Sequence, residues 1–479
     1  MQWVVFAGSM VPQKQPLENL AQVSKSCPKI NPIVFPPKLR EKRTDMLQLF
    51  GAGIISLWLE TIGIQPPTWQ PQELLTPNLL LLEQQDPSIK ATVKQYLERL
   101  SQKGFIQAEQ GIWIQSGDNL LANYAGDKPL PAASLTKVAT SLASLKTWKP
   151  GYQFVTQIGA TGPIDNGVLQ GDLVIQGSGD PLFVWEEAIS LGNTLNTMGI
   201  NRVMGDLVIT GNFGMNYETD PGLAGNLLRE GLNAQAWSPE AEAQYSTMPK
   251  GTPRPHVVIA GIVRPAVAPP LQQRLLISHQ SLHLFELLKQ MNIYSNNAMA
   301  EMLAASLGGA SVVAQQAAIA AEVPPTEIQL LNGSGLSPEN RISPRAVCGM
   351  FQAIQRQLQP YNLTIADLFP VAGRDRGTLE TRKIPQAAVV KTGTLWDVSA
   401  LAGVIPTRDY SSVWFAIINR GEGVEEFRDQ QDQLLQALSQ HWGAAQTLPP
   451  AFRYHPIMER VGETSRNTIL LPHAAQPSS

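Results

Sequence analysis

A serine and a lysine stand three positions apart in the stretch "LPAASLTKVATSLASL", residues 130–145. Apolar side chains follow at the spacing of a buried helical stripe, so Ser134 and Lys137 are predicted to share one helical face. A serine hydroxyl is a weak nucleophile at neutral pH unless a neighbouring base takes its proton. Lys137 could be that base if burial or nearby positive charge lowers the pKa of its ammonium group. A surface lysine that lies along the apolar stripe is the simpler alternative.

Two further short motifs contain residue types that such a site could use. Ser295 and Asn297 form an S-x-N motif that interrupts or borders a strongly periodic helical region. A single K-T-G motif, formed by Lys391, Thr392 and Gly393, lies in the strand-like stretch "AAVVKTGTL". Glycine inside a strand usually marks a bulge or a close approach of another backbone.

Each of these motifs is weak when it is taken alone. S-x-x-K also occurs at Ser26 and Lys29, where no helical stripe follows, and S-x-N recurs at Ser465 and Asn467. The specific observation is the order S-x-x-K, S-x-N, K-T-G, set in a predicted helix, a helix border and a strand. This ordered set is typical of penicillin-recognising serine enzymes.

The chain resembles the D-alanyl-D-alanine carboxypeptidase/endopeptidase family, the class C low-molecular-mass penicillin-binding proteins. Three further stretches look like signatures of that family: "GSGDPLF" (177–183), "NGSGLSPENRIS" (332–343) and "PVAGRDRGTLE" (370–380). The resemblance covers residues 85–442. It implies an α+β fold with a penicillin-binding domain of the serine β-lactamase and transpeptidase type.

By this resemblance, the matching residues of the first two motifs have roles in acyl transfer. Ser134 would attack the carbonyl of the penultimate D-alanine, and Lys137 would take the serine proton. Ser295 would relay a proton to the leaving amine, and Asn297 would hydrogen-bond the substrate amide.

The resemblance also assigns roles to the K-T-G strand. Lys391 would lend positive potential, and Thr392 would bind the terminal carboxylate of the substrate beside Gly393. The backbone N–H groups of Ser134 and Thr394 would form the oxyanion hole, which is typically the largest electrostatic contribution to such catalysis.

The resemblance therefore implies a serine-type D-Ala-D-Ala carboxypeptidase, with endopeptidase action on peptidoglycan cross-links as a further activity. Peptidoglycan stem peptides would be the substrates, and β-lactam antibiotics would be covalent inhibitors. Two alternatives stay open. A serine β-lactamase would use the same acylation with fast deacylation, whereas a non-catalytic wall-binding protein would share only the fold. The presence of all the motif side chains argues against the second alternative.

Composition excludes several other classes of function. The net charge of −3 provides no basic field for nucleic acid. With two cysteines, the chain has neither a disulfide scaffold nor a cysteine-rich zinc site, and Cys348 is predicted to be a buried helical residue. His279 and His283 are spaced i, i+4 but lack the glutamate of an H-E-x-x-H motif, so we expect no metal and no cofactor.

The chain of 479 residues is long for one domain, and its patterning suggests four parts. These are an N-terminal extension (1–84), a catalytic domain (85–151 and 259–442), a strand-rich inserted domain (152–258) and a loose C-terminal tail (443–479). About 160 residues separate Ser134 from Ser295, which is shorter than in family members that bear two inserted domains. We therefore expect one principal insert.

The order of the predicted elements favours one sheet architecture. A helix over 89–104 precedes a hairpin with its turn at residues 116–118, and a helix near the end of the chain follows further strands. An antiparallel sheet whose first and last helices cover one face fits this order better than a βαβ wind. Within the insert, the stretches 169–180 and 203–214 resemble each other and predict two similar strand-turn units.

Residues 46–63 contain an apolar run behind a basic stretch, which is the order of an export signal. The run is too short for a comfortable transmembrane helix but suits a secretory signal, cleaved or retained as a membrane anchor. A buried or amphipathic helix of a cytosolic protein is the alternative. The expected location is therefore exported, periplasmic or in the cell envelope.

Overall fold

The computed structural model describes residues 87–443, 445, 449–456 and 459–470. The predicted N-terminal extension (1–84), its export or anchor segment (46–63) and the second S-x-x-K motif at Ser26 lie outside the described residues.

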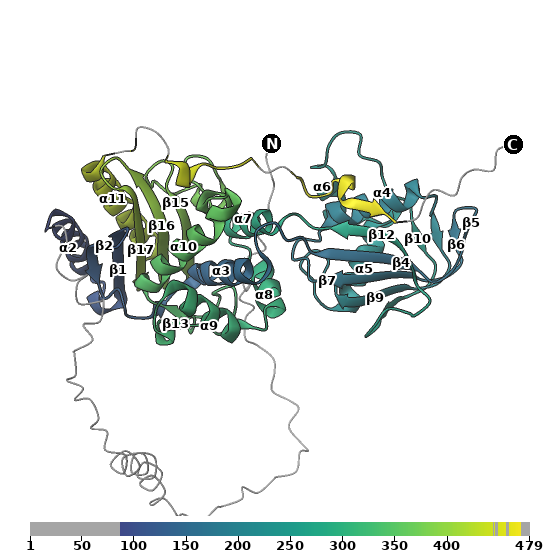
Figure 1. Cartoon of the computed structure of the whole chain (residues 1–479), viewed down its shortest axis with the longest axis horizontal. Coiled ribbons are helices and arrows are strands. Elements are labelled where there is room, and N and C mark those ends of the chain that lie inside the picture. The colour runs from purple at the N-terminus through teal and green to yellow at the C-terminus, as the bar shows by residue number, and fades with distance from the viewer. Residues whose placement is uncertain (1–86, 444, 446–448, 457–458, 471–479) are drawn as a thin grey trace, which may run out of the picture. The chain divides into compact units, whose positions relative to one another are not determined.

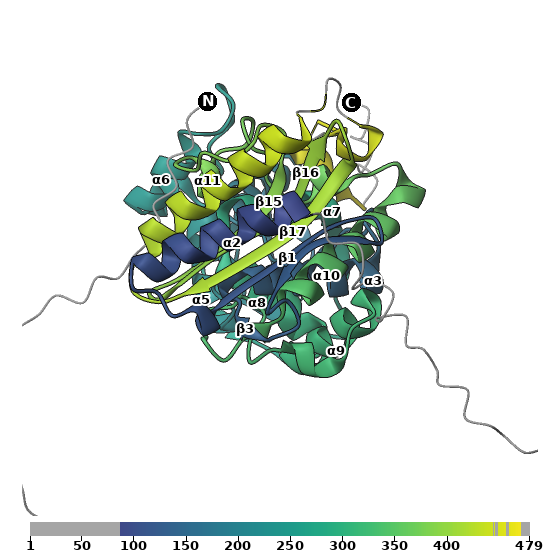
Figure 2. The same cartoon turned by 90° about the vertical axis from the view of Figure 1, so that its left-hand side faces the viewer.

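A five-stranded antiparallel sheet forms the centre of the catalytic domain, in the order β15-β16-β17-β1-β2. Its strands are β1 (Gln110–Ser116), β2 (Asn119–Tyr124), β15 (Val389–Leu395), β16 (Val398–Thr407) and β17 (Ser411–Arg420). The first described helix, α2 (Pro87–Gln102), and the long helix α11 (Val424–Trp442) cover one face of this sheet (Figures 1 and 2). The expected α+β fold, with an antiparallel sheet between helices, is confirmed.

The opposite face of the sheet packs on helices that carry the first motif. The central helix is α3 (Thr136–Trp148), in which every side chain from Thr136 to Leu145 is buried. A 3₁₀ turn, η4 (Ala133–Leu135), leads into it. Helix α10 (Pro344–Leu358) packs beside α3 and is capped by Ser343, whose hydroxyl accepts a hydrogen bond from the Ala346 N–H. A serine cap followed by proline is a strong helix start.

A small three-stranded sheet joins the chain before Ser134 to a loop that is distant in sequence. It consists of β3 (Leu130–Pro131), β13 (Ile328–Gln329) and β14 (Arg341–Ile342). The Ala132 N–H donates to the Asn340 carbonyl at 2.8 Å immediately after β3. Because β13 and β14 pair with each other and β14 pairs with β3, the loop between β13 and β14 starts and ends beside the turn that carries Ser134.

The inserted domain is built on two sheets that share one hydrophobic cluster. The larger sheet contains β4 (Val155–Ala160), β7 (Leu173–Ser178), β9 (Leu207–Asn212), β11 (Val263–Pro265), β12 (Arg274–Gln280) and β18 (Asn467–Ile469). The smaller contains β5 (Ile164–Asp165), β6 (Val168–Leu169), β8 (Arg202–Val203) and β10 (Val258–Ile259). The buried apolar residues of the inserted domain thus form one cluster, and the expectation of one principal insert stays a prediction.

The two similar stretches of the insert lie side by side. Strands β7 and β9 pair in parallel, with Leu173 opposite Leu207 and Gly177 opposite Gly211. Parallel neighbours need a crossover connection, and α4 (Trp185–Thr197) supplies it. The insert is therefore richer in helix than the sequence predicted, with α5 (Pro221–Gly231) and α6 (Pro239–Tyr245) in addition.

The predicted boundary of the insert at residue 258 is wrong. The larger sheet continues through β11 and β12, so the insert ends near Gln280. Helix α7 (Leu284–Tyr294) begins directly afterwards and belongs to the catalytic core. The sequence does not reveal this boundary, because β11 has three residues and a proline-containing stretch separates it from β12, so neither strand shows a sustained alternation.

The predicted loose tail is also wrong for its described parts. Strand β18 pairs with β12 at the edge of the larger sheet, and Phe452 is buried in the core of the catalytic domain. Arg466 is buried and forms an ion pair with Glu187 of α4. These contacts join residues that are distant in the sequence, so no local periodicity predicts them.

The second S-x-N motif has a structural role in this same segment. The Asn467 side chain bonds to His279 and donates to the hydroxyl groups of Ser190 and Thr194. Asn467 therefore holds the C-terminal segment on the inserted domain. Its contacts differ from those of the first S-x-N motif, in which Ser295 and Asn297 bond to lysines.

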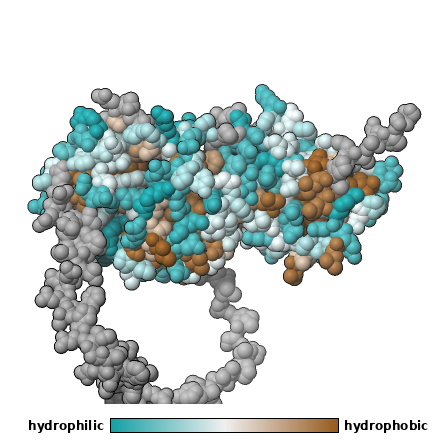
Figure 3. Space-filling view, in the orientation of Figure 1, coloured by the Kyte–Doolittle hydropathy of each residue, from teal (hydrophilic) through white to brown (hydrophobic). Residues whose placement is uncertain are grey.

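The visible surface in Figure 3 is mostly hydrophilic, with hydrophobic patches over the inserted domain and near α9 (Ala310–Ala321). Ile319 of α9 is among the exposed large hydrophobic residues. Within the described part of the chain, no single helix combines the length and apolarity needed to cross a membrane.

Replacing Arg466 by leucine should destabilise the protein by about 3–5 kcal/mol, because Glu187 would remain buried without its partner. Urea denaturation followed by tryptophan fluorescence measures this change. Arg229→Leu is the matched control in the same domain, since Arg229 is exposed on α5 and donates to the exposed Asn226, so its loss should change the midpoint little. Equal midpoints for the two variants would contradict the structural role of Arg466.

Candidate active site

The structure brings the three sequence motifs together. Ser134 lies in η4, and Lys137 lies in the first turn of α3. Lys137 Nζ is 3.0 Å from Ser134 Oγ and donates to Asn297 Oδ1 at 2.7 Å. From the sheet, Lys391 Nζ donates to Ser295 Oγ at 2.9 Å. Residues separated by more than 250 positions therefore meet in two neighbouring hydrogen-bonded groups, and the charge of Lys137 in one acts on Lys391 in the other.

A break between two helices positions the S-x-N residues. Helix α7 ends at Tyr294 and is capped by Ser295, which has a left-handed backbone with φ 53° and ψ 40°. The next helix, α8 (Asn297–Ser306), begins after Asn296, whose side chain accepts a hydrogen bond from the Met299 N–H at 3.0 Å. The predicted border of a helical region is confirmed, and the cap at Asn296 explains why one periodic stretch forms two helices.

The stretch 370–380 supports the end of α7. Lys289, buried in α7, donates to Asp375 Oδ2 at 2.6 Å. Gly377 has φ +74°, and a Cβ there would lie 2.5 Å from the Ile293 carbonyl oxygen. The loop thus packs directly against the backbone that precedes Ser295, which fixes the position of the helix break.

The turn that carries Ser134 is held in a sparsely populated backbone conformation. Ala133 has φ 47°, a value that costs a non-glycine residue about 1–3 kcal/mol. Strand β15 passes very close to this turn, since a Cβ on Gly393 would lie 2.8 Å from the Ala132 carbonyl oxygen. The close backbone approach expected at Gly393 is confirmed. Ser134 is partly exposed, whereas Lys137 is fully buried.

Burial lowers the pKa of the Lys137 ammonium group to about 7, while the negative charge of Glu301 acts in the opposite direction. Burial also lowers the pKa of Lys391 well below its usual range, and the charge of Lys137 lowers it further. The structure therefore places two amines where the protonated form is disfavoured, and Lys137 can exchange a proton near neutral pH.

The three polar partners of Lys137 match the needs of a neutral amine. Besides Asn297 Oδ1, the Lys137 amine donates to the Ser334 carbonyl at 2.7 Å. A neutral amine has two N–H groups and one lone pair, and these two oxygens can accept both N–H groups. The lone pair is then directed at Ser134 Oγ, which is the arrangement that proton removal from the serine requires.

The remaining residues of the K-T-G strand differ in exposure. Thr392 is buried, whereas Thr394 is exposed and its hydroxyl accepts a hydrogen bond from Arg428 of α11 at 2.9 Å. Trp396, just past the motif, has 77% of its surface exposed. Arg428 could not be found from the sequence, because it lies more than 30 residues after Thr394 and no local pattern connects it to the motif.

Ser334 and Glu301 also contribute to the site, although neither belongs to the three motifs. Ser334 lies in the family-like stretch 332–343, but its contribution is a backbone carbonyl, which any residue type could supply. Glu301 stands four residues after Asn297 on α8, so the i, i+4 spacing could have placed both on one face.

The other residues singled out by type lie away from this cluster. His279 is buried in β12 and His283 caps α7, so the two do not share a helix. Among the described residues, no group of three or more His, Cys, Asp or Glu side chains is placed to hold a metal ion. Cys348 is buried in α10, where burial raises the pKa of its thiol.

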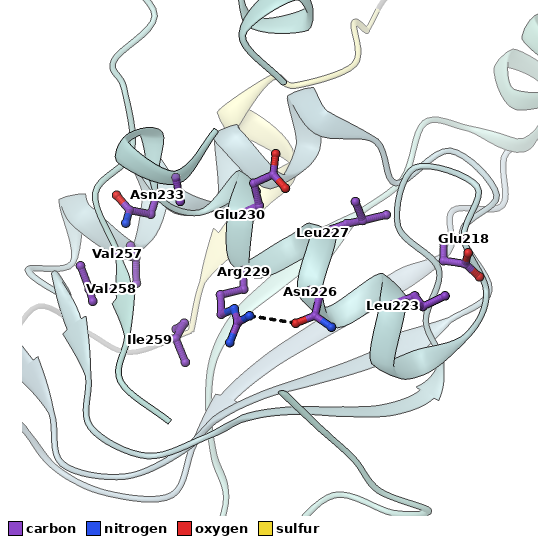
Figure 4. A pocket seen from close by; sticks show the side chains of 11 residues that line it. Glu218, Leu223, Asn226, Leu227, Arg229, Glu230, Asn233, Val257, Val258 and Ile259 are labelled. Atoms are coloured by element: carbon purple, nitrogen blue, oxygen red, sulfur yellow. Dashed lines mark hydrogen bonds between the residues drawn. The ribbon is translucent and has the colours of Figure 1, made fainter. Parts of the chain in front are cut away.

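The inserted domain has a pocket of about 640 Å³ between α5 and β10 (Figure 4). Its lining includes Asn226, which accepts a hydrogen bond from Arg229 at 3.0 Å, and the apolar Leu227 and Ile259. No residue of the three motifs lines this pocket, so it is separate from the cluster around Ser134.

A family model described as the D-Ala-D-Ala carboxypeptidase 3 (S13) family matches residues 93–226 and 256–441. The chain is 34% identical over 92 residues to the D-alanyl-D-alanine carboxypeptidase DacB of Haemophilus influenzae, which is 19% of each chain. It is 30% identical over 164 residues to a carboxypeptidase DacB of Mycolicibacterium smegmatis, across 30% of this chain and 35% of that one. The chain thus spans about a fifth and about a third of these two relatives.

A longer match is to a carboxypeptidase of Mycobacterium tuberculosis, 26% identical over 343 residues, which covers 62% of this chain and 72% of that protein. Among solved structures, a penicillin G-acylated predatory endopeptidase of Bdellovibrio bacteriovorus has a TM-score of 0.62 at 20% identity, over 75% and 98% of the two chains. Penicillin-binding protein 4 of Haemophilus influenzae has a TM-score of 0.56 at 19% identity, over 73% and 99%. These structural likenesses show the fold.

Gly335→Ala should disturb the turn that carries Ser134. Gly335 has φ +88°, and a Cβ there would overlap the Ala133 carbonyl oxygen, so either the loop or the turn must move. We expect a loss of about 3 kcal/mol or more in the free energy of unfolding, from backbone strain and overpacking together. Thermal and urea unfolding measure it.

Gly117→Ala is the matched control for Gly335→Ala. Gly117 also has a positive φ, +55°, but a Cβ there would meet nothing within 4 Å. It should lose only the strain of the left-handed backbone, about 1–2 kcal/mol. If both variants lost the same stability, the close contact at Ala133 would have no energetic consequence.

Proposed function

The chain belongs to the D-Ala-D-Ala carboxypeptidase 3 (S13) family, and from this premise we propose that it is a serine-type D-Ala-D-Ala carboxypeptidase. Its substrates would be peptidoglycan stem peptides, and cleavage of cross-links would be a second activity of the same site. The observation that carries the proposal is the 3.0 Å distance from the buried Lys137 amine to Ser134 Oγ, with two other oxygens accepting from that amine.

Acylation would begin with neutral Lys137 taking the proton of the Ser134 hydroxyl. The serine oxygen would then form a bond to the carbonyl carbon of the penultimate D-alanine. The negative charge that develops on the carbonyl oxygen would be stabilised by the backbone N–H groups of Ser134 and Thr394. Such preorganised donors are usually the largest electrostatic contribution in acyl transfer.

The leaving group would be released through the second motif. Ser295, whose oxygen accepts from Lys391, would give a proton to the amine of the terminal D-alanine as the C–N bond breaks. Lys137 would then pass on the proton that it took from Ser134, and this proton would replace the one that Ser295 gave to the amine. Lys137 would thereby become neutral again. Water would then hydrolyse the ester and restore the serine hydroxyl.

Binding of the substrate would use the positive potential and the hydroxyl groups of β15. Lys391 would attract the terminal carboxylate, and Thr392 and Thr394 would donate hydrogen bonds to it. Asn297 would contact the substrate amide from α8. Its Oδ1 accepts from Lys137, so the Nδ2 group is the part of this side chain that can donate.

The names of three relatives support the same activity, since each of them is named a carboxypeptidase. A structural neighbour that carries a penicillin G acyl group also supports covalent reaction with β-lactams. We therefore propose that β-lactams acylate Ser134 of this chain by the same chemistry as the peptide substrate.

Benzylpenicillin should add the mass of one drug molecule to the purified protein, and Ser134→Ala should abolish the addition. Intact-mass spectrometry over several hours measures both the adduct and its lifetime. A persistent adduct favours the carboxypeptidase, whereas rapid turnover of the drug without a lasting adduct would favour a β-lactamase. Identical inertness of the wild-type and Ser134→Ala proteins would contradict the proposal and favour a wall-binding role.

A further inference from the structure

We propose that Glu301 is a positioning residue of the acylation reaction, which holds the Ser334 carbonyl where it orients Lys137 as the base. The inference rests on the proposed function, since it concerns how the same amine is prepared for its step. It adds a residue that lies outside the three motifs and that contacts the base through a loop.

The Glu301 carboxylate binds two successive backbone N–H groups of the loop between β13 and β14. Oε2 accepts from the Gly333 N–H at 3.1 Å, and Oε1 accepts from the Ser334 N–H at 2.9 Å. Hydrogen bonds to an ionised carboxylate are stronger than those between neutral groups, and two parallel bonds also fix orientation. Helix α8 thereby determines the direction of the peptide groups at Gly333 and Ser334.

The contact affects Lys137 through the next peptide group of the loop, which follows the two that Glu301 binds. The Ser334 carbonyl oxygen accepts from Lys137 Nζ at 2.7 Å. Asn297, on the same helix as Glu301, provides the second acceptor through Oδ1 at 2.7 Å. Helix α8 therefore positions both oxygens that accept from the N–H groups of neutral Lys137. It positions Asn297 Oδ1 directly and the Ser334 carbonyl through the loop.

The loop has little freedom to shift without moving this acceptor. Thr140 of α3 donates to the Gly333 carbonyl at 2.7 Å, and the Gly335 N–H donates to Asn332 Oδ1 at 2.9 Å. A Cβ on Gly333 would overlap the Ala304 side chain of α8. The loop is thus fitted between α3 and α8, and the two hydrogen bonds from Glu301 set its orientation there.

The charge of Glu301 has a second effect on the same amine. Glu301 of α8 is the charged side chain that acts on the pKa of Lys137, and the charge of Lys137 in turn lowers the pKa of Lys391 of β15. The negative charge of Glu301 raises the pKa of Lys137 against the effect of burial. Because Lys137 acts as a base only when it is neutral, acylation should rise with pH through the pKa of Lys137.

Two substitutions separate the charge of Glu301 from its reach. Glu301→Gln removes the charge and leaves one accepting oxygen, so the acylation rate should fall. Because the charge of Glu301 raises the pKa of Lys137, the rise of the acylation rate with pH should also move to lower pH. Glu301→Asp keeps the charge but is one methylene shorter, so the rate should fall while the rise stays at the wild-type pH. Misplacement of a reacting group can cost up to about a hundredfold in rate, and we expect a fall of about tenfold to a hundredfold.

The measurement is the second-order rate of acylation by benzylpenicillin from pH 5 to 9, quantified by intact mass, with the melting temperature recorded for each variant. Glu98→Gln is the control, because Glu98 is an exposed glutamate on α2 that pairs with Lys94. It should change neither the rate nor the pH at which the rate rises.

The outcomes distinguish this inference from the proposed function. If the wild-type protein forms no adduct, both are overturned. If the wild type is acylated and both Glu301 variants match it in rate and pH profile, only the inference is overturned. A fall in rate for Glu301→Gln without a shift in pH would contradict the electrostatic part, and if that variant does not fold, an unchanged rate in Glu301→Asp would overturn the positioning role.

Discussion

Burial of the Lys137 amine within the central helix α3 is the constraint on which the site depends. A protonated amine is costly there, so burial lowers its pKa to about 7 and the neutral form becomes accessible. The surroundings then have to supply acceptors for two N–H groups and leave the lone pair facing Ser134. The break between α7 and α8 supplies Asn297, and the loop between β13 and β14 supplies the Ser334 carbonyl.

The same constraint explains features of the fold that lie further from the serine. Strand β15 must run close to the Ser134 turn if Lys391 is to reach Ser295, and Gly393 makes this approach sterically possible. The C-terminal segment has contacts with both parts of the chain, since Phe452 packs in the catalytic core and Arg466 pairs with Glu187 in the insert. It therefore links the two domains in addition to the connections that flank the insert.

The sequence predicted those features that depend on local periodicity or on motif order. The helix after Ser134, the helix border at Ser295, the strand around Lys391 and the antiparallel sheet could all be inferred, and the structure has each of them. The end of the insert and the course of the C-terminal segment could not, because they depend on the pairing of short strands and on one buried ion pair. Ser334 acts through its backbone carbonyl, so no residue type reveals it.

The acylation rate of Lys137→Met tests the central claim most directly. Methionine fills a similar volume without an amine, so the variant should fold with its melting temperature preserved while Ser134 loses its base. General base catalysis contributes about 10²–10⁴-fold to such steps, so we predict that the second-order rate with benzylpenicillin falls by at least about a hundredfold at pH 8. A folded variant that reacts at the wild-type rate would show that Lys137 is not the base and would contradict the account.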